Sequence, residues 1–117
     1  MKTFAGRKLG RPTASRMMML RNLATSLLQH EKIITTLPRA KELSRYAEKI
    51  ITAAKGEVPV TARREVSGKV LNRDVQKKLF EVLVPRYSAR SGGYTQIVRT
   101  GFRTGDSAPM ALIRLIP

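Results

Sequence analysis

Apolar residues follow a helical period in the first third of the chain. Between residues 20 and 28 they fall at i, i+3, i+4, i+7 and i+8, which predicts a helix packed on a core through one face. Thr13 or Ser15 can cap the start of this helix. Met18 falls on the opposite side and is expected to be exposed. The predicted core positions are Leu20, Leu23, Ala24, Leu27 and Leu28.

A strand and a second helix are predicted to follow. Residues 32–37 are rich in β-branched side chains and are stopped by Pro38, which favours a strand. Pro38 also suits the first turn of a helix, and Gly56 after Lys55 suits its end. The positions expected to face the core are Ala40, Leu43, Ala47, Ile50 and Ala54.

Two shorter helices are predicted in the middle of the chain. Pro59 can open a helix that Gly68 ends. Asn72 can cap another helix that Pro85 closes. The apolar face of this last helix is Val75, Leu79, Val82 and Leu83.

The C-terminal part of the chain is predicted to be β-structure. Residues 94–100 and 110–116 read as two strands that should pair antiparallel because they are close in sequence. The order helix, strand, three helices, two strands predicts a small two-layer α+β domain over residues 13–117. Residues 1–12 hold two Gly, one Pro and four bases with little to bury, so we expect an extended basic arm.

Charge gives the strongest indication of a partner. The formal net charge is +15, from 23 basic and 8 acidic residues, and two-thirds of it lies in residues 1–30 and 82–117. Self-repulsion at this charge is best explained by a polyanionic partner. Three Phe and three Tyr are too few for a base-stacking platform. Contacts to the phosphates and 2′-hydroxyls of folded RNA therefore fit better.

The composition excludes most catalytic chemistry. The eight acidic residues are scattered with no D-x-D pair, His30 is the only histidine, and there is no Cys. No phosphate-binding glycine loop is present. We therefore expect no enzyme, no metal, no cofactor and no small-molecule substrate. No apolar run approaches the length of a membrane span, so no membrane partner is expected.

Two segments carry the candidate RNA contacts. The arm offers Lys2, Arg7, Lys8 and Arg11, and the same charge continues onto the first helix at Arg16 and Arg21. In the second segment, residues 89–106, a Gly92-Gly93 turn permits close backbone approach and Tyr94 and the threonines offer stacking and hydroxyl groups. Charge there comes from Arg90, Arg99 and Arg103.

Other interpretations of these segments stay open. The arm could be a solvated tail, and the arginine-rich hairpin a solvated edge that discourages aggregation. Residues 1–30 also have the texture of a mitochondrial transit peptide. An architectural DNA-binding protein is the main alternative function, and a cationic membrane-surface helix is a third.

Four motifs resemble a known family. R-N-L-A-T-S-L (21–27), H-E-K-I-I-T-T-L-P-R-A-K-E-L (30–43), R-S-G-G-Y-T-Q-I-V (90–98) and G-D-S-A-P-M-A (105–111) are similar to the bacterial-type large-subunit ribosomal protein "L-seventeen" family. The resemblance spans essentially the whole chain. It implies a two-layer α+β domain on large-subunit ribosomal RNA, near the rim of the polypeptide exit tunnel and beside other ribosomal proteins. It also implies no catalysis and no cofactor.

The resemblance implies site residues as well. G-R-K-L-G-R (6–11) matches the arm of the family that runs into ribosomal RNA. The Gly10 and Pro12 variant is also similar to organellar relatives, so an organellar ribosome is the alternative to a cytoplasmic one. The other matching positions are Arg16, Arg21, Asn22, Thr35, Thr36, Arg39, Lys41, Arg90, Gly92, Gly93, Tyr94 and Thr95.

Overall fold

The computed structural model of the protein describes residues 13–56 and 59–117. Its elements are α1 (Thr13–His30), β1 (Lys32–Thr36), α2 (Leu37–Ala54), α3 (Pro59–Ser67), α4 (Arg73–Lys78), the π-helical turn η1 (Leu79–Leu83), α5 (Val84–Tyr87), β2 (Thr95–Phe102) and β3 (Pro109–Leu115). Because α4, η1 and α5 follow one another without a break, they form one helical segment. The predicted element order is therefore confirmed.

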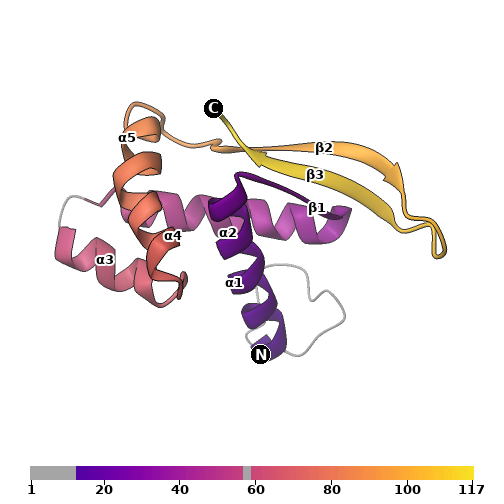
Figure 1. The fold of residues 1–117 in the computed structure, drawn as a ribbon, viewed down its shortest axis with the longest axis horizontal. Helices are drawn as coiled ribbons and strands as arrows, with labels where there is room; N and C mark the ends of the chain where they lie inside the picture. Colours follow the sequence, from indigo (N-terminus) through magenta and orange to yellow (C-terminus); the bar gives the residue numbers. More distant parts are fainter. Residues whose placement is uncertain (1–12, 57–58) are drawn as a thin grey trace, which may run out of the picture.

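The three strands form one antiparallel sheet in the order β1-β3-β2. The predicted pairing of the two C-terminal strands is confirmed, and β1 adds to the free side of β3 with Ile33 opposite Ile113. Ala111, Ile113 and Leu115 are buried against the helices. No helix of the described residues covers the other face, where Ile34 is 63% exposed. One helical layer on one face of the sheet is the predicted two-layer architecture (Figure 1).

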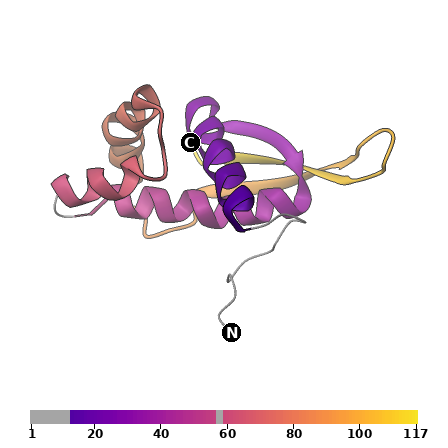
Figure 2. The same ribbon diagram turned by 90° about the horizontal axis from the view of Figure 1, so that it is seen from below.

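Helix α2 organises the molecule. Figures 1 and 2 show it running along the sheet, with α1 crossing it, α3 and α4 at its C-terminal end, and the β2–β3 hairpin extending past its N-terminal end. All five positions predicted to face the core from α2 are buried. The predicted face of α1 is also buried, except that Leu23 is only partly covered. Met18 is 48% exposed, as predicted.

The prediction that Pro85 closes the last helix is wrong. Asn72 does cap the start, since its Oδ1 accepts hydrogen bonds from the backbone N–H groups of Asp74 and Val75. The helix then widens at η1 and continues to Tyr87, with Pro85 in the first turn of α5. The π-helical turn shifts the hydrogen-bond register, so the missing N–H of proline falls where it is tolerated. Val82, predicted to face the core, is instead 44% exposed.

Glu31 connects the end of α1 to helices α4 and α5. It occupies the left-handed region at φ 64° between α1 and β1. Its carboxylate accepts from Arg86 at 2.6 Å and pairs with Lys78 at 3.0 Å. The hydrogen bond from Arg86, followed by that from Lys78, lowers the pKa of Glu31. These two bases are therefore committed to the fold.

Candidate RNA-binding surface

Five predicted RNA-binding residues lie at one end of the molecule. Thr36 at the end of β1 pairs with Met110, and Met110 pairs with Gly101 of β2, so the start of α2 and the hairpin are neighbours. Figure 1 shows the hairpin leaving the helical layer at this end. We call this surface the hairpin end, and it comprises Thr36, Arg39, Lys41, Arg99 and Arg103.

Arg99 is the base of the hairpin end most open to a partner. It is exposed, and no hydrogen bond or ion pair within the described part of the chain engages it. A break in the strand register lies between Arg99 and Gly101, and Gly101 has a φ of 124°. Such a bulge twists an edge strand and redirects its side chains. Lys41 is likewise exposed and Arg39 partly so, which gives this end three available cations.

Arg103, predicted to supply free charge, is paired within the loop. Its Nε and Nη2 donate to the two carboxylate oxygens of Asp106 at 3.1 and 2.5 Å. Asp106 also accepts from the backbone of Ala108, and these bonds, led by the one from Arg103, lower its pKa to about 2. The pair stabilises the tight loop, so Arg103 contributes less charge to the surface than predicted.

The predicted glycine turn lies at the opposite end of β2 from the hairpin end. Gly93 has a φ of 66°, in the left-handed region that favours glycine. Arg99 lies six positions further along the extended chain, a span of about 20 Å. The turn and the hairpin end are therefore two surfaces, although both belong to one continuous sequence segment.

The prediction that Tyr94 stacks on RNA is wrong, because its side chain is buried. Tyr94 is 1% exposed, and its ring lies 5.0 Å from that of Tyr87. Its hydroxyl accepts from Lys55 Nζ at 2.8 Å and donates to the carbonyl of Arg90. Thr95 also turns inward, where its hydroxyl bonds Glu48 at 3.0 Å and Ser44 at 2.7 Å. Both side chains position the turn.

Lys55 holds the glycine turn in place, a contact that the sequence interpretation did not include. Besides Tyr94 it donates to the carbonyl of Arg90 at 2.5 Å, and so joins the end of α2 to the turn. Arg90 itself donates from Nε to the carbonyls of Gly92 and Gly93 at 3.3 and 3.2 Å. This bond orients the exposed guanidinium, and its terminal nitrogens have no partner within the described residues. Only a basic residue at a helix end could have indicated Lys55 in advance.

Replacing Gly93 by valine should destabilise the fold by about 1–2 kcal/mol, because a β-branched residue is strained at positive φ. A Cβ on Gly93 meets no atom within 4 Å, so the backbone is the whole cause. Gly92→Val is a matched control, since its Cβ also meets nothing and its φ is not in the left-handed region. Urea unfolding measures both. Equal costs would show that the turn does not depend on φ at Gly93.

The remaining predicted residues are less accessible or undescribed. Asn22 on α1 is exposed, whereas Arg21 is partly covered and its Nε is buried. Arg16 and Thr35, predicted as RNA contacts, are 1% and 7% exposed and so are not open surface groups. The four basic residues of the arm, Lys2, Arg7, Lys8 and Arg11, lie outside the described residues.

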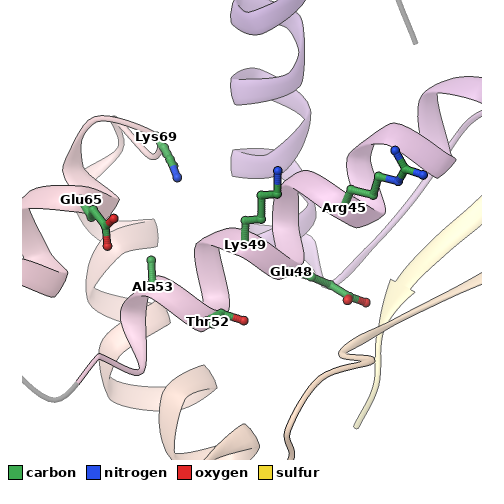
Figure 3. Close-up of a pocket in the computed structure, with 7 residues that line it drawn as sticks. All are labelled: Arg45, Glu48, Lys49, Thr52, Ala53, Glu65 and Lys69. Atoms are coloured by element: carbon green, nitrogen blue, oxygen red, sulfur yellow. The ribbon is translucent and has the colours of Figure 1, made fainter. Parts of the chain in front are cut away.

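A hollow of about 800 Å³ lies between α2 and α3 (Figure 3). Arg45, Lys49 and Lys69 line it together with Glu48 and Glu65, so its charges largely offset one another. Glu48 is already bonded to Thr95. No group of three or more His, Cys, Asp or Glu residues that could hold a metal occurs in the described ranges. No helix in those ranges could cross a membrane.

Comparison with known proteins identifies the family. The family model described as ribosomal protein L17 matches residues 19–116. A relative named large ribosomal subunit protein bL17, from Moorella thermoacetica, is 54% identical over 112 residues, covering 96% of this chain and 99% of that protein. The protein of the same name from Endomicrobium trichonymphae is 49% identical over 115 residues, covering 98% and 97%. The chain therefore belongs to the ribosomal protein L17 family.

Proposed function

We propose that this protein binds large-subunit ribosomal RNA near the rim of the polypeptide exit tunnel, beside other ribosomal proteins of the subunit. Its family is that of a structural constituent of the large ribosomal subunit, not an enzyme. The location at the tunnel rim follows from the family resemblance.

The hairpin end is the observation that carries the proposal. Arg39, Lys41 and Arg99 come from distant parts of the chain, and the sheet register brings them to one end. None of the three is neutralised by an ion pair within the described residues. Unpaired cations gathered at one end of a fold are suited to phosphate contacts that position a protein on RNA. The basic arm, residues 1–12, is proposed to add further phosphate contacts.

The alternative of an architectural DNA-binding protein has no support in the family or the fold. The family model and the relatives that match this chain are those of ribosomal proteins. Duplex DNA should therefore compete only through nonspecific electrostatics, which added salt weakens.

The variant Arg39→Gln/Lys41→Gln/Arg99→Gln should bind large-subunit ribosomal RNA about 100-fold more weakly at 0.1 M salt, if each base meets one phosphate. The slope of log affinity against log salt should fall by roughly 2–3. Filter binding across a salt series measures both quantities. The control variant Arg45→Gln/Lys49→Gln/Arg64→Gln removes the same charge elsewhere on the helices. If both variants weaken binding equally, the hairpin end contributes only to the overall positive charge and is not a specific contact surface.

A further inference from the structure

The groove between α3 and α4 is a second concentration of positive charge. It has a volume of about 300 Å³. Arg63 lines it from α3, and Arg73, Gln76 and Lys77 line it from α4. Phe80 and Glu81 of η1 complete the lining. Three cations against one carboxylate leave the groove positive.

The cations of this groove are not committed to the fold. No ion pair or hydrogen bond within the described part of the chain engages the side chains of Arg63, Arg73 or Lys77. Neighbouring bases of the same helical segment behave differently, because Lys78 and Arg86 are both paired with Glu31. The fold therefore separates structural bases on one side of this segment from available bases in the groove.

An aromatic ring holds one of these cations in position. The guanidinium carbon of Arg63 lies 5.3 Å from the centre of the Phe80 ring. A guanidinium over a ring face loses rotational freedom but keeps its N–H donors at the edge. Those donors match the spacing of two phosphate oxygens. The groove thus presents an oriented donor from α3 opposite two charges from α4.

The groove and the hairpin end lie at opposite ends of α2. Arg39 is in the first turn of that helix, whereas α3 and α4 lie beyond its C-terminal half (Figure 1). The 18 residues of α2 span about 27 Å at 1.5 Å per residue. The phosphates that meet the groove are therefore not those that meet the hairpin end.

We propose that the α3–α4 groove binds the phosphate backbone of a second RNA segment, distinct from the one at the hairpin end. This inference rests on the proposed function, because it assumes that ribosomal RNA is the ligand. The protein would then join two parts of the RNA through the rigid length of α2.

The test compares charge removal at the two ends in the full-length protein. The variant Arg63→Gln/Arg73→Gln/Lys77→Gln should weaken binding of large-subunit ribosomal RNA about 100-fold at 0.1 M salt and lower the salt slope by roughly 2–3. Combined with the hairpin-end substitutions, the losses should multiply to about 10⁴-fold, because distant sites act additively in free energy. Arg64 is adjacent to Arg63 on α3 but does not line the groove. Arg64→Gln is therefore the control for the single variant Arg63→Gln, and it should change affinity less than about threefold.

The effects of the groove variant and the hairpin-end variant together distinguish the two proposals. If the hairpin-end variant weakens binding and the groove variant does not, the second segment is refuted while the proposed function stands. If neither variant weakens binding, both fail. Losses that do not multiply would mean that the two surfaces are alternative sites for one segment, which also overturns the inference. Phe80→Leu, which removes the ring face but keeps an apolar side chain, should weaken binding several-fold with all charges intact.

Discussion

Replacing Tyr94 by alanine is expected to destabilise the protein by about 3–5 kcal/mol, the usual cost of truncating a buried aromatic residue. The ring is 1% exposed and packs on Tyr87, which itself bonds the carbonyl of Ile116 at 2.5 Å. The side chain also joins Lys55 to the glycine turn. Its loss would open the junction between α2, the turn and the end of β3. Urea unfolding at neutral pH measures the change.

Tyr94→Phe separates packing from hydrogen bonding at the same position. The variant keeps the ring and loses the hydroxyl that bonds Lys55 and Arg90, so it should cost about 1 kcal/mol. A Tyr94→Ala protein that is as stable as wild type but binds RNA poorly would contradict the buried position. It would also restore the interpretation of Tyr94 as a base-stacking residue.

Deleting residues 2–12 is expected to have the largest effect on RNA affinity of any single change. The segment carries Lys2, Arg7, Lys8 and Arg11 and no acid. Four phosphate contacts at roughly 0.7–0.9 each in the salt slope correspond to about three decades of affinity between 1 M and 0.1 M salt. The loss should be similar for all RNA sequences, because phosphate contacts carry no sequence information. Filter binding over a salt series measures it.

A full-length control distinguishes charge from length. Substituting the four bases of the arm by glutamine should reproduce most of the loss, because the contacts are electrostatic. If deletion leaves the salt slope unchanged, the arm is only a solubility tail and the proposed RNA contacts of residues 1–12 are wrong.

Helix faces could be predicted from the sequence because their signal is local. Leu20, Ala24 and Leu27 repeat at the helical period, and each is buried. The same holds for Leu43 and Ile50 on α2. Periodicity reports directly which positions share a face, so the predicted α+β class and element order follow from it.

Features that depend on distant contacts could not be predicted. The pairing of β1 with β3 joins Ile33 to Ile113, and nothing in either short strand specifies that partner. Pro85 is accommodated only because a π-helical turn precedes it. The burial of individual side chains could not be predicted for the same reason, because Tyr94 is covered by Tyr87 and Lys55 from distant parts of the chain. The glycine turn at Gly93 was predictable because its requirement is in the backbone.

We propose that this chain is built into the large ribosomal subunit through its RNA contacts. Sucrose-gradient fractionation of cell lysate in high-magnesium buffer tests it directly, with the wild-type chain and the Arg90→Ala variant followed side by side. Wild type should sediment with large subunits. Arg90→Ala removes an exposed guanidinium and two exposed hydrogen bonds, so it should be recovered there in smaller amount with nearly unchanged thermal stability. A wild-type chain that stays at the top of the gradient or sediments with DNA would contradict its incorporation into the large subunit.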